Sequence, residues 1–200
     1  PSNIQGMPTW YEVRVSEEGY LGRRGGVDIM LSVNPQSMPS DIQEVEPGGY
    51  FIYDNTKPLD RHLVRDDVTT IGLPLTQICS DQYKEPQQRK LFKNVIYVGA
   101  LAALLDIDFA VLTALVSDQF KGKEKLVLPN IHALELGHQY AQANFECPIG
   151  IRVTRSDKVG DKIMLDGNTA LGLGALYGGA SVVAWYPLTP STSVIDSFER

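Results

Sequence analysis

The feature that most constrains the fold is an almost unbroken apolar run, Val27-Asp-Ile-Met-Leu-Ser-Val33. A strand that is covered on both faces carries apolar residues at nearly every position, whereas a strand with one wet face alternates apolar and polar residues. Asn34 and Pro35 end the run. We therefore predict a buried strand of the kind found in parallel sheets with helices on both faces.

The segments on either side of this run also carry strand patterns. Residues 10–16 alternate apolar and polar side chains, which predicts a half-buried strand, and a glycine-rich loop follows. A short helix is predicted around residues 41–46, and further strands are predicted at 50–53 and 68–73. Strands that alternate with helical segments indicate an α/β fold with a parallel sheet.

From Leu91 onward the apolar residues follow helical spacing. This spacing predicts helices at residues 95–105, 109–120 and 134–145, and Asp108 is expected to cap the second of them. The aliphatic faces of these helices would cover the sheet.

A second unit is predicted in the last part of the sequence. Residues 151–166 are polar and rich in turn formers, which is typical of a linker. A small-residue helix at 169–177, capped by Asp166, is followed by a predicted buried strand at 181–185. The chain then enters a hydroxyl-rich turn at 186–192 and the start of another helix.

Composition excludes several classes of function. The net charge of −6 argues against a nucleic acid or an anionic membrane as the main partner. The longest apolar run, residues 95–105, is far shorter than the roughly 20 residues that span a bilayer. Two cysteines form no disulfide framework and no secretory signal is present, so we expect a reducing, cytoplasmic location. The sequence opens on Pro1 without a methionine and closes on Arg200 within a helical pattern, so we expect both ends to be internal to a longer chain.

The turn Tyr186-Pro-Leu-Thr-Pro-Ser-Thr192 is the strongest candidate for a binding site. A strand would deliver it to a helix N-terminus, where unpaired backbone N–H groups and the helix dipole favour an anion. Thr189 could cap that helix with Pro190 at its first position, or Ser193 could cap it with Asp196 completing a capping box. From the residues alone, a simple helix start and a carboxylate site both stay open.

Two blocks of sequence resemble the large subunit of 2-oxoacid:ferredoxin oxidoreductases, and they follow each other in the order of its gamma and pyrimidine-binding domains. The segment from Gly167 to Ala180 and the turn at 186–192 are similar to the opening of that subunit's pyrimidine-binding domain, with Leu188 in place of the usual isoleucine. The preceding residues resemble its gamma domain in these motifs: Arg14-Val-Ser16, Arg24-Gly-Gly-Val-Asp28, Asn34-Pro35, Glu46-Pro-Gly-Gly49, Tyr53-Asp-Asn-Thr56, Asn94 to Asp108, and Ala133 to Ala141. One departure is Ile4-Gln-Gly-Met7, where relatives often carry an arginine.

The resemblance implies a fold and a domain organisation. Residues 1–150 would form a Rossmann-like gamma domain, a parallel sheet with helices, whose N-terminal part lies outside this sequence. Residues 151–166 would be the linker. Residues 167–200 would begin a pyrimidine-type α/β domain that binds thiamine diphosphate.

The resemblance also implies an enzyme. Such a protein oxidatively decarboxylates a 2-oxoacid, here expected to be 2-oxoglutarate, to acyl-coenzyme A and reduces ferredoxin. It uses thiamine diphosphate with Mg²⁺ and iron–sulfur clusters, which are expected on partner chains such as the small (beta) subunit. These 200 residues lack the usual diphosphate motif and the roughly four cysteines of a cluster, so we expect no catalytic residue, no metal ligand and no activity from this part alone.

The resemblance implies roles for a few residues. Thr189 would bind the substrate carboxylate, and its neighbours would shape the turn: Tyr186, Pro187, Pro190, Ser191 and Thr192. Arg23 and Arg24 are possible contacts for coenzyme A. Two alternatives stay open: residues 1–150 could be a non-catalytic docking module for coenzyme A or a partner subunit, or the chain could come from a relative specific for indolepyruvate or pyruvate.

Four weaker candidates have plainer interpretations. The glycines between Gly172 and Gly178 favour close helix packing over a dinucleotide site, because they precede a predicted strand. His132 and His138 fall on different faces of a helix and make a poor metal pair. Asp54, at a predicted strand end, favours turn capping over ribose binding. Cys79 and Cys147 are expected to be buried small residues rather than nucleophiles.

Overall fold

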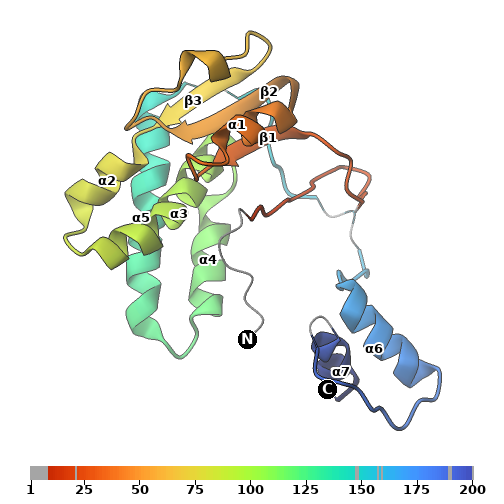
Figure 1. Ribbon diagram of the computed structural model, residues 1–200. Coiled ribbons are helices and arrows are strands. Elements are labelled where there is room, and N and C mark those ends of the chain that lie inside the picture. Colours follow the sequence, from red (N-terminus) through yellow and green to blue (C-terminus); the bar gives the residue numbers. More distant parts are fainter. Residues whose placement is uncertain are drawn as a thin grey trace. The chain divides into compact units, whose positions relative to one another are not determined.

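The computed structural model describes residues 9–20, 22–146, 149–156, 158, 160–188 and 191–199. It divides into two compact units, Pro8–Arg155 and a smaller unit that contains Ser156–Arg200 (Figure 1). The division falls inside the segment 151–166 that the sequence predicts as a linker. None of the described helices is both long enough and apolar enough to cross a membrane.

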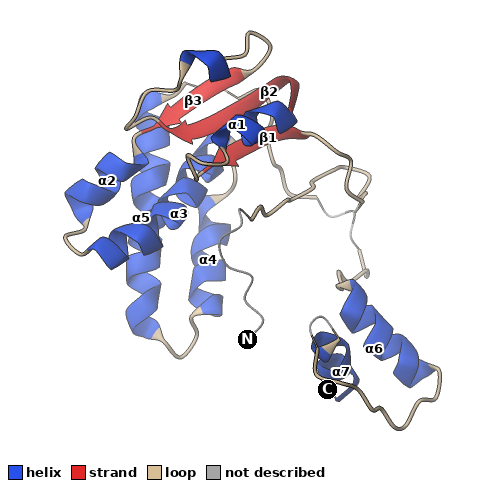
Figure 2. Cartoon of the chain, viewed as in Figure 1, coloured by secondary structure: helices blue, strands red, loops and turns tan. Residues whose placement is uncertain are grey.

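The larger unit is built on a parallel sheet, as predicted (Figure 2). Its described strands are β1 (Val27–Ser32), β2 (Val45–Asp54) and β3 (Thr69–Leu73), in the order β1-β2-β3. Leu31, Ile52 and Ile71 lie side by side across the sheet. The three strands predicted between residues 27 and 73 are therefore present, and β2 begins earlier than its apolar stretch because Val45 already pairs with Val27, before the register shifts and Tyr50 pairs with Ile29.

Neighbouring residues of β2 bury opposite faces of the sheet, as the period of a strand requires. Ile52 joins the main core, together with Ile71, Ile96 and Tyr97, under the long helices. Phe51 points to the other face, where it packs with Ile42, Val45, Leu63 and Val68. The run at 27–33 is thus apolar because its strand belongs to a sheet that is covered on both sides.

The larger unit has five described helices and two 3₁₀ turns. They are α1 (Met38–Asp41) with the 3₁₀ turn Ile42–Glu44, the 3₁₀ turn Arg61–Leu63, α2 (Leu75–Gln82), α3 (Pro86–Leu104), α4 (Phe109–Gln119) and α5 (Glu124–Asn144). Helices α2, α3 and α5 cover the main core, whereas Ile42 and Leu63 of the 3₁₀ turns pack on the other face of the sheet. The predicted short helix at 41–46 lies at 38–44, and the helix predicted at 134–145 begins ten residues earlier, at Glu124. Asp108 caps α4 as expected, because its carboxylate accepts a hydrogen bond from the Ala110 backbone N–H at 3.0 Å.

Helices α3 and α5 approach each other closely through a pair of glycines. A Cβ atom at Gly99 would overlap the backbone carbonyl of Leu134, and a Cβ atom at Gly137 would overlap the backbone carbonyl of Ile96. The obstructing atoms are main-chain atoms, which no side-chain rotation can move away. Each glycine therefore sets how near the two helices lie.

The strand predicted at residues 10–16 is wrong. These residues form no strand, and Tyr11 is 93% exposed. A period-two pattern becomes a strand only where a neighbouring strand supplies hydrogen bonds, and no described strand pairs with this segment. Instead, the Trp10 indole N–H donates to Asp41 at 2.7 Å, and Glu12 pairs with Arg23 at 2.9 Å.

Asp41 is a buried carboxylate that holds this N-terminal segment. It is only 3% exposed, and it accepts hydrogen bonds from Trp10 and from the hydroxyls of Ser32 and Ser37 at 2.7 and 2.9 Å. A buried carboxylate is tolerated when donors satisfy its oxygens. The three donors come from the N-terminal segment, the end of β1 and the loop before α1, so Asp41 joins all three.

The smaller unit contains α6 (Gly167–Tyr177) and α7 (Thr192–Glu199). Asp166 caps α6, as predicted, by accepting hydrogen bonds from the backbone N–H and the hydroxyl of Thr169. The buried strand predicted at 181–185 is wrong: the segment is not a strand, and Val182 is 83% exposed. The described residues of this unit offer it no strand to pair with.

Candidate functional site

The hydroxyl-rich turn before α7 is held together by Ser191. Its hydroxyl donates to the backbone carbonyl of Leu188 at 2.5 Å and lies 3.3 Å from that of Tyr186. The backbone N–H of Ser191 also donates to Leu188 at 2.9 Å, and that of Leu188 donates to Tyr186 at 2.7 Å. Ser191 therefore closes the turn from inside.

The structure places some of the predicted site residues and not others. Thr189 and Pro190 lie outside the described residues. Tyr186 is 81% exposed and Pro187 is also exposed. Thr192 is the first residue of α7, so the alternative start with Ser193 as the N-cap is wrong: Ser193 already lies inside the helix. The cause is the Ser191 carbonyl, which accepts a hydrogen bond from Val194 and so starts the helical pattern earlier.

Helix α7 packs closely on α6. A Cβ atom at Gly172 would lie 2.7 Å from the carbonyl oxygen of Val194, so only glycine fits there without a shift. The interpretation of this glycine as a helix-packing residue is confirmed, whereas Gly174 faces open space. The Asn168 amide donates to the Ser193 hydroxyl at 2.7 Å, which joins the first turns of the two helices.

A second polar cluster lies at the carboxyl end of β2, where ligands often bind in parallel sheets. Asp54 ends the strand and accepts hydrogen bonds from the hydroxyls of Thr56 (2.7 Å) and Thr76 (2.5 Å). The Lys93 ammonium group lies 2.6 Å from the same carboxylate. Burial by itself would raise the pKa of Asp54, but the hydrogen bonds from Lys93, Thr56 and Thr76 outweigh it and lower the pKa to about 2.

The cluster of Asp54, Thr56, Thr76 and Lys93 is a structural joint, which links the end of β2 to the start of α2, rather than a ribose site. Asp54 also accepts from the backbone N–H groups of Thr56 and Thr76, so it caps both the turn after β2 and the start of α2. The interpretation of Asp54 as a turn-capping residue is confirmed. Its partners Thr76 and Lys93 were not anticipated, because nothing in the local sequence links them to this strand end.

The remaining sequence candidates are dispersed. Arg23 pairs with Glu12, and Arg24 lies 2.9 Å from Asp28; both are exposed ion pairs. Such pairs are weak in water. The contact of these arginines with coenzyme A stays a prediction.

Cys79, His132 and His138 are the cysteine and histidine candidates that the structure describes. Cys79 is 2% exposed and burial raises the pKa of its thiol, which confirms its interpretation as a buried small residue; Cys147 lies outside the described residues. His138 packs on the Phe109 ring at 4.6 Å, and His132 lies near Glu135. Among the residues that the structure describes, no group of three or more His, Cys, Asp or Glu side chains could hold a metal ion.

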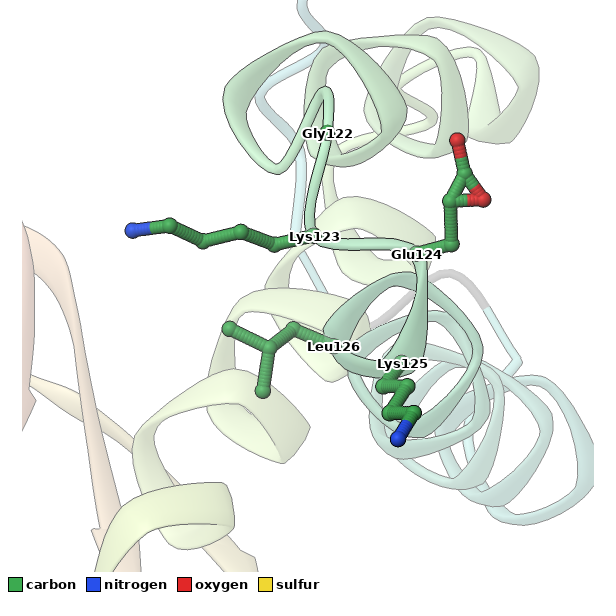
Figure 3. A pocket seen from close by; sticks show the side chains of 5 residues that line it. All are labelled: Gly122, Lys123, Glu124, Lys125 and Leu126. Atoms are coloured by element: carbon green, nitrogen blue, oxygen red, sulfur yellow. The ribbon is translucent and has the colours of Figure 1, made fainter.

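A surface hollow lies at the turn between α4 and α5, lined by Gly122, Lys123, Glu124, Lys125 and Leu126. Figure 3 shows that the side chains of Lys123, Glu124 and Lys125 point in different directions. Binding pockets are concave sites in which a few polar groups converge on the ligand. This hollow therefore offers no ligand chemistry.

Comparison with known proteins gives consistent matches. The family model described as pyruvate ferredoxin/flavodoxin oxidoreductase matches residues 1–140. The alpha subunit of 2-oxoacid:ferredoxin oxidoreductase 2 from Aeropyrum pernix is 26% identical over 96% of this chain and 36% of its own length. The 2-oxoglutarate oxidoreductase subunit KorA from Mycobacterium tuberculosis is 20% identical over 95% of this chain and 33% of its own length.

One solved structure is similar in both sequence and fold. It is the 2-oxoglutarate:ferredoxin oxidoreductase from Magnetococcus marinus with 2-oxoglutarate, coenzyme A and succinyl-CoA bound. The TM-score is 0.72 with 27% sequence identity, covering 89% of this chain and 31% of that one. The present chain thus spans about a third of the length of these relatives.

Proposed function

The chain belongs to the pyruvate ferredoxin/flavodoxin oxidoreductase family, and from that premise we propose that it is part of the large subunit of a 2-oxoacid:ferredoxin oxidoreductase. This enzyme oxidatively decarboxylates a 2-oxoacid to acyl-coenzyme A and reduces ferredoxin. The observation that carries the proposal is the extent of the match. The Aeropyrum alpha subunit aligns along 96% of the chain, which includes both the α/β unit and the turn before α7.

The proposed domain division follows the same relationship. Residues 1–150 are assigned to the gamma domain, 151–166 to the linker and 167–200 to the start of the pyrimidine-binding domain. The division of the structure between Arg155 and Ser156 supports this assignment. The proposed cellular location is the reducing cytoplasm, which suits the buried free thiol of Cys79.

The proposed substrate is 2-oxoglutarate. Two of the relatives support it by name, and one of them holds 2-oxoglutarate, coenzyme A and succinyl-CoA. The Aeropyrum protein is named for 2-oxoacids in general, so a direct comparison of substrates is needed.

The cofactors are assigned to partner chains. An iron–sulfur cluster needs about four cysteine ligands, whereas this sequence has two and one of them, Cys79, is buried in the core. The described residues also contain no cluster of carboxylates that suits Mg²⁺. Thiamine diphosphate with Mg²⁺ and the clusters do not fit the described part of this chain, and the small subunit is their proposed carrier.

The proposed contribution of this chain to the active site is to orient the substrate. The turn closed by Ser191 leads into α7, whose N-terminal N–H groups favour an anion. We place the carboxylate of the oxoacid at this turn, with Thr189 as a hydrogen-bond donor and with Tyr186, Pro187, Pro190, Ser191 and Thr192 shaping the turn. The exposed side chain of Tyr186 leaves the turn accessible.

The function is tested with the full-length parent chain, co-expressed with its small subunit. Reduction of ferredoxin or a viologen dye is followed with 2-oxoglutarate, pyruvate and indolepyruvate, each with and without coenzyme A. We expect the fastest reduction with 2-oxoglutarate, and only when both subunits and coenzyme A are present. No reduction by any of these oxoacids, from a complex shown to hold thiamine diphosphate and iron–sulfur clusters, would contradict the proposed reaction.

The role of Thr189 is tested in the same assembled enzyme. Thr189→Ala removes one hydrogen bond to a charged group, and such bonds contribute about 1.5–3 kcal/mol. We expect kcat/KM for the oxoacid to fall at least roughly tenfold, while Thr189→Ser keeps most of the activity. Unchanged KM and kcat in the alanine variant would show that Thr189 does not bind the carboxylate.

A further inference from the structure

A side-chain hydrogen bond joins the first turns of α6 and α7. The Asn168 amide nitrogen donates to the Ser193 hydroxyl at 2.7 Å. Asn168 is the second residue of α6 and Ser193 is the second residue of α7. The bond therefore lies beside the end of α7 whose backbone N–H groups face the hydroxyl-rich turn, and not at its middle or far end.

Other contacts hold the same side of α7 against α6. Gly172 packs under the backbone of Val194, and the Ser197 hydroxyl lies 3.4 Å from that of Thr169. These contacts involve α7 residues 193, 194 and 197, which lie on one side of the helix because Ser197 is four positions after Ser193 and three positions after Val194. Rotating α7 about its axis would break the Asn168 bond and move the Val194 carbonyl off Gly172.

The first turn of α6, which carries Asn168, is itself held in place. Asp166 accepts from the Thr169 hydroxyl at 2.6 Å and from its backbone N–H at 3.0 Å, so the first turn of α6 is capped immediately beside Asn168. On the other side, Ser191 binds the carbonyls of the turn. Ser191 thus closes the turn, and Ser193 ties the helix that follows the turn to α6.

We infer that Asn168 is a positioning residue for the 2-oxoacid site. Its amide holds the N-terminus of α7, the helix that directly follows the turn, in one orientation against α6. This inference rests on the proposed function, because it takes that turn as the place of the substrate carboxylate. Asn168 acts through Ser193 and does not itself touch the substrate.

The inference predicts a selective kinetic effect in the assembled enzyme. A neutral hydrogen bond contributes about 1 kcal/mol, so Asn168→Ala should raise KM for the oxoacid roughly three- to tenfold. KM for coenzyme A should not change. Ser193→Ala should also raise KM for the oxoacid, and the effects of the two changes should not add fully, because both remove the bond between Asn168 and Ser193. Asn168→Asp offers an oxygen to the Ser193 hydroxyl and should restore most of the loss.

A matched control uses the same substitution in another helix. The Asn130 amide donates to the Leu126 carbonyl at 2.8 Å within α5, far along the sequence from the turn. Asn130→Ala should leave KM for both substrates unchanged. An equal rise in both KM values for Asn168→Ala would indicate general damage and would overturn the positioning role.

Hydrogen exchange tests the positioning role of Asn168 independently of the proposed function. Loss of the tie should speed exchange of the backbone N–H groups of residues 191–195 several-fold in Asn168→Ala, without any substrate present. Unchanged exchange together with unchanged oxoacid KM refutes the inference. If Thr189→Ala is kinetically silent while Asn168→Ala still raises the oxoacid KM and the exchange rates, the role of Thr189 is wrong and the positioning role of Asn168 stands.

Discussion

Gly137→Ala is expected to destabilise the Pro8–Arg155 unit by about 3 kcal/mol, near the upper end of the cost of overpacking. In an isolated helix this substitution would be favourable by about 1 kcal/mol, because alanine is the better helix former. Here the added methyl group would overlap the Ile96 carbonyl oxygen and crowd the Ala100 backbone nitrogen. Since both atoms belong to the backbone of α3, the two helices must separate.

The separation would affect the centre of the core. Helix α3 contributes Ile96, Tyr97 and Ala100, and α5 contributes Ala133 beside Gly137. Moving α5 outward loosens all of these contacts, because protein interiors are packed too densely to absorb a methyl group. Gly99→Ala, which meets the Leu134 backbone from the opposite helix, should cost a similar amount.

Urea denaturation followed by far-UV circular dichroism measures the effect. Gly174→Ala is the matched control, because it places the same methyl group inside α6 where no atom beyond the neighbouring backbone of α6 lies within 4 Å. It should leave the transition of the Pro8–Arg155 unit unchanged, whereas Gly137→Ala shifts the midpoint to lower urea. Equal midpoints for the two variants would mean that the close approach of α3 and α5 is not required.

The sequence predicts the elements whose signals are local. β1, β2 and β3 appear where apolar runs end at turn formers, and α4 begins at the carboxylate of Asp108 that caps it. Helix α2 was not predicted because only Leu75 and Cys79 of its eight residues are buried, so its apolar pattern is too sparse to recognise. The strands predicted at 10–16 and 181–185 fail for the complementary reason: their patterns are local, but a strand requires a neighbour.

The features of the candidate site also divide into those with a local sequence signal and those without one. Capping by Asp54 and Asp166 could be expected because an acidic residue at an element boundary is a local signal. The roles of Gly137 and Asn168 could not, because their partners are distant in sequence: Asn168 and Ser193 are 25 residues apart. A glycine inside a helix indicates only a weak helix former until the opposing backbone is known.

The joint at Asp54 should make the stability of the larger unit depend on pH in acid. The pKa of Asp54 is about 2 in the folded chain, against an ordinary value of 3.8. Between these values the unfolded chain binds a proton that the folded chain does not, so stability rises with pH there. The contribution is complete above about pH 4 and is lost as the pH falls to about 2. With partial solvent screening it amounts to about 1–2 kcal/mol.

Replacing Asp54 by alanine should lower the free energy of unfolding more than protonating its carboxylate does. Asp54→Ala leaves the Thr76 backbone N–H without this acceptor and the partly buried Lys93 ammonium without its ion-pair partner, so we expect a loss of about 2–3 kcal/mol at neutral pH. Asp28→Ala is the matched control: it removes an exposed ion pair with Arg24 and should cost less than about 1 kcal/mol.

Urea midpoints measured at several pH values between about 2 and 7 test both statements. The unchanged chain and Asp28→Ala should lose stability more steeply than Asp54→Asn as the pH falls from 4 to 2, because Asp54→Asn has no carboxylate to protonate at this position. Lys93→Met should reduce the slope in the same window, since the hydrogen bond from Lys93 is the largest cause that lowers the pKa of Asp54. Parallel curves for all four proteins would show that the Asp54 joint does not govern acid stability. Strand β2 and helix α2 would then be held together by their apolar contacts alone.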